Sequence, residues 1–271
     1  MKLTVLSDNY TYIDRYFIGE PALSFYIEEG DERILFDTGY SDSVIFNAEK
    51  MGINLSNLTT IVLSHGHNDH TRGLPYLWRK YDLHGVKLIA HPLAFMKKRY
   101  LGELIGAPFT RAECERHGME IIDGSKPVKI SERLLFLGEI QRVTAFEGKR
   151  PLGEYELDGR WTKDDLYDDS ALVYEGEAGL FIITGCSHSG ICNIICHACE
   201  LKKTEVRADG VIGGFHLMEE DEQLEETVRF LKDHTSGKLY PCHCVSLKAK
   251  HRMMQELPVE EVGVGMELVI R

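Results

Sequence analysis

The chain has 271 residues, 43% of them hydrophobic and 27% charged, so we expect a globular protein with a sizeable core. Its net charge of −12, from 31 basic and 43 acidic residues, disfavours nucleic acid as a partner. No segment reaches the roughly 20 apolar residues of a membrane span, and the first residues lack a signal-peptide pattern. We therefore expect a cytoplasmic protein with no membrane partner. Seven cysteines, an odd number, indicate free thiols rather than a disulfide framework.

Short apolar segments bounded by turn residues recur along the chain and predict strands. In chain order they are LTVL, LSFYIE, RILFD, TTIVLS, VKLIA, ALVYE, LFIIT, DGVIGG, KLYP and ELVI. Helical patterns lie between them, in SVIFNAEKMGI, in EEDEQLEETVRFLKDHTSG, which Gly237 is expected to end, and in SLKAKHRMMQEL. Strands that come early in pairs and later alternate with helices predict an α/β (α+β) fold of layered sheets covered by helices.

Five of these predicted strands end in a carboxylate or an imidazole. The residues are Asp37, His65, His188, His216 and His243. A histidine that serves only the core is expected in the middle of a strand. In layered α/β folds, by contrast, the crevice at the carboxyl ends of strands is where ligands bind. The pattern therefore predicts one functional site built from several strand ends.

The segment SHGHNDHTRGL places His65, His67, Asp69 and His70 in one short loop. Imidazole nitrogen and carboxylate oxygen together suit zinc or iron. His65 and His67, two positions apart in an extended loop, can share one metal, which leaves Asp69 and His70 to face a second. The alternative is a plain polar loop that opens a helix, but such a loop gives no reason for three histidines.

The same segment resembles the second signature of the metallo-β-lactamase superfamily. LFDTG with Asp37 resembles the first signature, GCSHSG the later single-histidine signature, and PCHC the last. The resemblance covers the whole chain and implies one domain over 1–271 with a four-layer αββα sandwich of two mixed sheets and helices outside. It also implies two divalent metal ions, zinc first and iron or manganese as alternatives.

The resemblance further implies a role for each matching residue. His65, His67 and His188 would hold the first metal, and Asp69, His70 and His243 the second. Asp37 would orient the metal loop. Most members of the superfamily carry a bridging aspartate after a strand, often as Gly-Asp, and no Gly-Asp stands at that place in this chain. Cys186, His216 and Asp169 are the candidates to replace it, and the sequence does not choose among them.

A narrower resemblance rests on DDSALV, GCSHSG, GGFHL and PCHC. These segments are similar to the branch of 7,8-dihydropterin-6-yl-methyl-4-(β-D-ribofuranosyl)aminobenzene 5'-phosphate synthase, a dihydropteroate-synthase-like activity. That reaction joins a dihydropterin diphosphate to an arylamine, and a metal pair could neutralise the departing diphosphate.

Several other cysteines have a structural and a functional interpretation. Cys192, Cys196 and Cys199 have a spacing that also occurs around iron–sulfur clusters, but the same spacing fits one face of a helix, where they would pack as small hydrophobic residues. Cys242 and Cys244 flank His243, and strand alternation would point both away from it. A thiolate near the metal is the alternative for that pair.

Residues 92–168 are more than the metal signatures require, and we expect a cap or lid within them. Basic and aromatic residues there could contact an anionic, planar substrate: Lys149, Arg150, Arg160 and Trp161. A plain surface loop is the alternative.

Together these features predict a hydrolase in which a metal-activated hydroxide attacks a small anionic, phosphorylated substrate. In that reaction Asp69 would orient the hydroxide, and His216 or Asp169 would move protons or contact substrate. The alternatives are a transferase that couples the dihydropterin diphosphate to the ribofuranosylaminobenzene phosphate, and a non-catalytic metal-binding or redox protein. A homo-oligomer is compatible with the sequence, which points to no interface.

Overall fold

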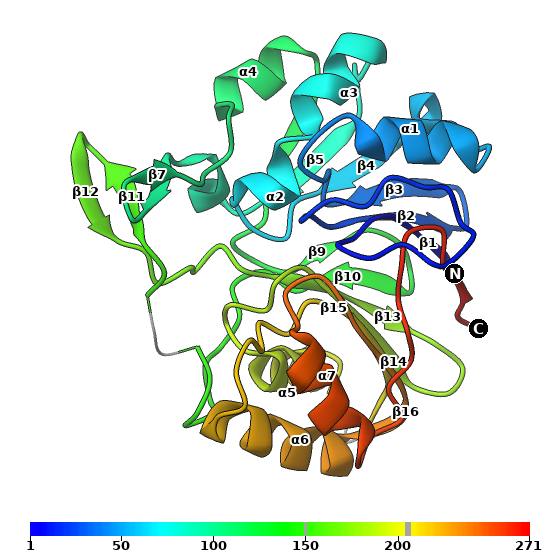
Figure 1. Ribbon diagram of the computed structural model, residues 1–271. Helices are drawn as coiled ribbons and strands as arrows, with labels where there is room; N and C mark the ends of the chain where they lie inside the picture. The colour runs from blue at the N-terminus through cyan, green and yellow to red at the C-terminus, as the bar shows by residue number, and fades with distance from the viewer. Residues whose placement is uncertain (149–150, 204–206) are drawn as a thin grey trace.

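A computed structural model describes residues 1–148, 151–203 and 207–271 (Figure 1). Two mixed sheets face each other in the middle of the molecule, and helices cover the outer face of each (Figure 1). Lys149 and Arg150, two of the predicted substrate contacts, lie outside the described residues.

The first sheet has seven strands in the order β17-β1-β2-β3-β4-β5-β8. Their bounds are β1 Lys2–Ser7, β2 Ser24–Glu29, β3 Glu32–Phe36, β4 Thr60–Val62, β5 Lys87–Ala90, β8 Glu120–Asp123 and β17 Glu267–Val269. The strands from β17 to β3 are antiparallel, and those from β3 to β8 are parallel. The parallel half therefore brings the carboxyl ends of β3 and β4 to the same edge.

The second sheet has six strands in the order β16-β15-β14-β13-β10-β9. Their bounds are β9 Val128–Lys129, β10 Leu134–Phe136, β13 Ala171–Glu175, β14 Leu180–Thr184, β15 Ala208–Gly213 and β16 Thr235–Pro241. β14, β15 and β16 are parallel, so their carboxyl ends also share an edge. Every residue of β14 is buried, as expected for a parallel strand covered on both faces.

Apolar side chains fill three layers of core. The layer between the sheets includes Phe25, Phe36, Phe136 and Ile183. The first sheet packs under α1 Ser43–Lys50, α3 Leu74–Lys80 and α4 Arg111–Arg116, and the second packs under α5 Ile191–Leu201, α6 Glu222–His234 and α7 Leu247–Met254. Short turns of helix complete the chain at η1 Leu55–Asn57, α2 Asn68–Thr71 and η2 Pro92–Phe95. The layers follow the predicted αββα order.

The predicted end of α6 is wrong. The helix ends at His234, and Gly237 lies inside β16 rather than after the helix. A Cβ at Gly237 would lie 1.5 Å from the carbonyl oxygen of Asp209 on β15, so glycine is needed for the close approach of two parallel strands. A glycine after a helical pattern has the same appearance in sequence whether it caps the helix or lets strands approach.

A third sheet of four strands stands to one side of the sandwich, in the order β12-β11-β6-β7 (Figure 1). It comprises β6 Lys98–Tyr100, β7 Glu103–Leu104, β11 Glu154–Leu157 and β12 Arg160–Lys163. All four lie within residues 92–168, where a cap is expected, but β8, β9 and β10 of the main sheets lie in that range too. The cap sheet, as we call these four strands, is therefore interleaved with the sandwich.

Within the described parts of the chain, no helix is both long and apolar enough to cross a membrane.

Candidate metal centre

The five polar residues expected at strand ends follow β3, β4, β14, β15 and β16 in the structure. Three of them, Asp37, His216 and His243, have positive φ angles of 56°, 49° and 53°. This left-handed backbone is uncommon for residues other than glycine and costs free energy. Residues held in such conformations often occur at functional sites, because surrounding contacts must enforce them.

His65, His67 and His188 form the first cluster. One ring nitrogen from each lies within 4.8 Å of the others. The ring centroids of His65 and His67 are 4.6 Å apart, and each lies 4.9 Å from the ring of His188. Among the described residues, the buried Nε2 atoms of His67 and His188 have no hydrogen-bond partner. Buried polar atoms are rarely left unpaired, so these two nitrogens indicate a bound ligand such as a metal ion.

Burial sets the protonation of this first cluster. It lowers the pKa of all three histidines below the usual value of 6.5, and that of His67 to about 3. The neighbouring imidazoles and the Lys98 ammonium act in the same direction at His65 and His188. All three rings are therefore neutral at neutral pH, which is the form that ligates metal.

Asp69, His70, Cys186 and His243 form the second cluster, with one ligand-type atom of each within 4.8 Å of the rest. His70 Nε2 lies 3.1 Å from Cys186 Sγ and 3.2 Å from His243 Nε2. Asp69 Oδ2 lies 3.3 Å from His243 Nε2. Although burial alone would raise the pKa of Asp69, the charges of His70 and His243 lower it, so its carboxylate is ionised.

Asp37 holds this second cluster against the metal loop. Its carboxylate accepts hydrogen bonds from the backbone N–H of Ser64 at 2.7 Å and from the Ser64 hydroxyl at 2.7 Å. Its Oδ2 lies 2.6 Å from Nδ1 of His70, which turns Nε2 of that ring toward the cluster. Burial by itself lowers the pKa of His70, but Asp69 and Asp37 together raise it. Asp37 belongs to neither cluster.

Two residues just after β1 support His243, and the sequence analysis missed both. Asp8 Oδ1 accepts a hydrogen bond from the backbone N–H of His243 at 2.9 Å. Asn9 Oδ1 lies 3.0 Å from His243 Nδ1, so it fixes the ring with Nε2 facing Asp69 and His70. The signal that could have found them is the same as elsewhere, since LTVLSDN also ends a strand in polar residues.

A second missed group supports the loop of the first cluster. Asp168 Oδ2 accepts a hydrogen bond from the backbone N–H of Gly66, between His65 and His67, at 2.8 Å. Its other oxygen lies 2.8 Å from the ammonium of Lys98, on β6 of the cap sheet, and Asp164 pairs with the same ammonium at 2.8 Å. All three charged residues are buried. The loop thus rests on an ion-pair group that reaches the cap sheet.

The two loop glycines have steric reasons to be glycine. A Cβ at Gly66 would lie 2.5 Å from the carbonyl oxygen of Ala94, and one at Gly73 would lie 1.7 Å from that of Thr38. Neither position has room for a side chain, so both hold the metal loop tightly against its neighbours.

The three candidates to replace the bridging aspartate have different surroundings. Cys186 belongs to the second cluster, two residues before His188 of the first. The ring of His216 lies tilted against that of His188, with centroids 4.5 Å apart, but His216 belongs to neither cluster. Asp169 accepts from the backbone and hydroxyl of Ser189, and burial raises its pKa to about 6. Of the three, only Cys186 offers an atom to a cluster.

A cavity of about 470 Å³ opens over both clusters. Its wall includes His67, Asp69, Cys186, His188, His216 and His243, together with Asn9, Met218 and Cys244. Leu152, two residues before β11 of the cap sheet, also lines it. Arg160 and Trp161 are on β12 and are not among the described residues that line this cavity; Trp161 instead packs under the guanidinium of Arg99 at 4.2 Å.

The cysteines mostly take structural places. Cys192, Cys196 and Cys199 lie on α5, as the helical spacing predicts, and Cys192 is in the core. Cys242 is also in the core, whereas Cys244 lines the cavity and its thiol donates to the carbonyl of Cys186 at 3.5 Å. The predicted strand alternation around His243 is wrong, because β16 ends at Pro241 and His243 has a left-handed backbone.

The donor sets fit divalent metal ions. Neutral imidazoles with two unpaired buried nitrogens suit zinc or iron, and a set of carboxylate, imidazole and sulfur suits the same metals. The structure thus supports divalent metal binding without selecting the metal.

The sequence profile of the metallo-β-lactamase superfamily matches residues 18–192. The chain belongs to this superfamily, and the predicted αββα fold is confirmed.

Within it, the chain is 31% identical to 7,8-dihydropterin-6-methyl-4-(β-D-ribofuranosyl)-aminobenzene-5'-phosphate synthase of Methanocaldococcus jannaschii, over 94% of this chain and 91% of that one. It is 33% identical to an uncharacterized protein of the same organism, over 93% of this chain and 94% of the other. Among solved structures it resembles Tm1679, described as a metal-dependent hydrolase of the β-lactamase superfamily. The TM-score is 0.85 at 28% identity, with 100% of this chain and 99% of that one covered.

Proposed function

We propose that this protein is a metal-dependent hydrolase that acts on a small anionic, phosphorylated substrate. The observation that carries the proposal is the pair of clusters at the floor of one 470 Å³ cavity. His65, His67 and His188 would hold one divalent ion, and the second cluster would hold another, zinc in the first instance. Bound there, such ions supply a water of lowered pKa and stabilise negative charge on a departing oxygen.

The chain's own residues provide positioning around that chemistry. Asp37 and Asn9 fix the imidazoles of His70 and His243, so both present Nε2 to the cavity floor. Asp69, ionised and 29% exposed, is open to the cavity and can accept a hydrogen bond from a water or a substrate hydroxyl. Pre-set orientation of this kind lowers the entropy lost on reaching the transition state.

His216 is the residue we assign to substrate contact. It lines the cavity next to His188, and its left-handed backbone at φ 49° holds it there. Asp169 is not among the described residues that line the cavity, and Ser189 holds its Oδ2, although its buried Oδ1 has no hydrogen-bond partner in the described part of the chain. Leu152, in the segment that leads into β11 of the cap sheet, would limit access from one side and keep bulk water out when substrate is bound.

A second candidate function is the transferase reaction named for the relative at 31% identity. The match over 94% of the chain favours it specifically. In that reaction the arylamine would attack the pterin methylene, and the diphosphate would leave toward the metal clusters. The same site would therefore serve both functions, and they differ in the nucleophile that the cavity admits.

One set of assays separates the two. Metal-loaded protein is incubated with phosphodiesters, phosphomonoesters and lactones, and in parallel with a dihydropterin diphosphate plus the ribofuranosylaminobenzene phosphate. Turnover of a phosphate ester without an amine acceptor supports the proposed hydrolase, whereas turnover of lactones alone would keep a hydrolase but contradict the phosphorylated substrate. A coupled product that forms only with both substrates, with no hydrolysis of any ester, would replace it with the transferase.

A further inference from the structure

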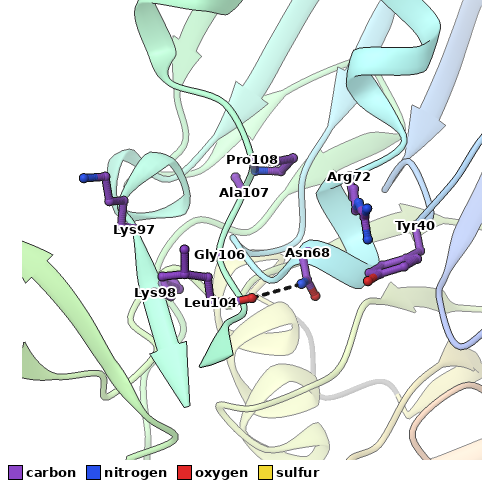
Figure 2. A pocket seen from close by; sticks show the side chains of 9 residues that line it. All are labelled: Tyr40, Asn68, Arg72, Lys97, Lys98, Leu104, Gly106, Ala107 and Pro108. Carbon is purple, nitrogen blue, oxygen red and sulfur yellow. Dashed lines mark hydrogen bonds between the residues drawn. The ribbon is translucent and has the colours of Figure 1, made fainter. Parts of the chain in front are cut away.

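A second cavity, of about 320 Å³, lies behind the metal loop, apart from the cavity over the clusters (Figure 2). Residues 67–69 separate the two spaces. His67 and Asp69 line the first cavity, and Asn68 between them lines the second. The opposite wall comes from the cap sheet and the segment that follows it, through Leu104, Gly106, Ala107 and Pro108. A molecule bound here would therefore touch both the metal loop and the cap.

Arg72 gives this second cavity a positive charge that no described residue pairs. Its guanidinium lies over the ring of Tyr40 at 4.3 Å. Among the described residues, that guanidinium has no hydrogen-bond or ion-pair partner, although it is only partly exposed and the chain carries a net charge of −12. Arginine offers five donors in a planar fork that matches oxyanions, and stacking on Tyr40 holds the fork in place.

Further donors lie beside that guanidinium. Arg72 is four residues after Asn68, and its backbone N–H bonds to the Asn68 carbonyl, so both side chains share one face of α2. Figure 2 shows Arg72, Tyr40 and Asn68 on one side of the cavity, with the Asn68 amide reaching toward the carbonyl of Leu104 at 3.4 Å. That contact is long for a hydrogen bond, so the amide can turn to a ligand.

The other charges near this cavity are already paired. The ammonium of Lys98 is held by Asp164 and Asp168, and that of Lys97 lies 3.1 Å from Glu156. Glu20 accepts hydrogen bonds from the backbone N–H of Tyr40 at 2.9 Å and from the Ser41 hydroxyl, and it is not among the described residues that line the cavity. The described residues that line the cavity include no carboxylate. A ligand here therefore meets the charge of Arg72 without an opposing acid.

We propose that this cavity, lined by Arg72, Asn68 and Tyr40, binds the phosphate group of a phosphate ester. A guanidinium fork, an amide and a phenol together offer more donors than the two oxygens of a carboxylate need, which suits the three free oxygens of a phosphate monoester. The volume also leaves room for part of the organic group. The ligand's phosphate would couple the cap sheet to the metal loop through Asn68.

The test is calorimetric titration of the metal-loaded full chain with inorganic phosphate and with phenyl phosphate. Arg72→Gln is compared with Arg79→Gln, a matched control because Arg79 is exposed and lies over the ring of Tyr76 at 5.6 Å. Loss of a charge-assisted fork is expected to weaken phenyl phosphate binding roughly 10- to 100-fold in Arg72→Gln. Arg79→Gln is expected to bind as the wild type does, and Arg72→Lys to fall between.

Metal content and thermal unfolding of each variant show whether the fold and the clusters are intact. Equal affinities of wild type and Arg72→Gln for both probes would overturn the proposal, since phosphate would then bind only at the metals. An effect on inorganic phosphate alone would mean a free-phosphate site and would overturn the ester assignment. The inference stands apart from the hydrolase proposal, because it is read from binding and needs no turnover.

Discussion

The two ligand clusters share one cavity, yet they differ in how far protein groups already satisfy their ligand atoms. The first consists of imidazoles only, and two of its buried nitrogens have no hydrogen-bond partner among the residues that the structure describes. The second contains a carboxylate and a thiol, and Asp37 and Asn9 already hold its histidines. Buried nitrogens without partners gain most from a cation, whereas the second cluster is partly satisfied without one. The first cluster should therefore depend more strongly on metal.

The supports of the clusters also come from different parts of the fold. Lys98 on the cap sheet holds the first through Asp168 and Gly66, while β1 holds the second through Asn9. Substitutions in the cap sheet should consequently weaken metal binding at the first cluster, and substitutions near β1 should weaken it at the second.

His67→Ala has the largest expected effect. It opens the first cluster, so we expect loss of most bound metal and of all turnover, because one of three imidazole ligands is gone. Elemental analysis and an ester hydrolysis assay measure both. His251→Ala, on the exposed face of α7, is the control. Full activity of His67→Ala would contradict the assignment of the first cluster.

Lys98→Met is expected to lower the free energy of unfolding by about 3–5 kcal/mol, because it leaves Asp164 and Asp168 buried without their cation. Its neighbour Lys97 is 71% exposed, so Lys97→Met should cost less than about 1 kcal/mol. Chemical denaturation gives both values. Equal losses in the two variants would show that the buried ion pairs do not support the loop.

The pH dependence of the metal-free protein tests the neutral state of the first cluster. The pKa values of His65, His67 and His188 are lowered in the folded state, that of His67 to about 3, so unfolding takes up protons below pH 6.5. Stability should fall as pH drops, by up to about 1.4 kcal/mol per pH unit for each histidine. The raised pKa of His70 adds no slope in that range, since His70 is charged in both states. Asp169, whose pKa is raised to about 6, takes up a proton in the folded state and offsets part of the loss. Denaturation of chelated protein between pH 6 and pH 5 should lose roughly 3 kcal/mol; a flat profile would contradict this.

Asn9→Ala has the smallest expected effect and acts on the second cluster alone. Loss of the partner of His243 Nδ1 should weaken metal binding there by roughly 10- to 100-fold, as for other residues that orient a ligand. Competition with a chelator, which resolves a tight and a weaker metal, measures it. If the tighter metal is the one affected, the division between the clusters is wrong.

The fold and the ligand-type residues were predictable because they depend on local signals. Polar residues that follow predicted strands indicate one edge of the sheets: Asp37, His65, His188, His216 and His243. The layered order of elements, together with the family resemblance, implied the αββα fold. The supports were less predictable. Lys98 and Asp168 are 70 residues apart in the chain, and nothing in either neighbourhood indicates that they meet in the core. That Cys186, rather than His216 or Asp169, offers an atom to a cluster likewise became visible only in the folded arrangement.

The most direct test of the central claim is elemental analysis of the wild-type protein purified without added metal. The account predicts close to two zinc, iron or manganese ions per chain, one for each cluster. A value near one that drops to zero in His67→Ala would support a metal at the first cluster and contradict one at the second. No bound metal at all, in protein that is folded, would contradict the account.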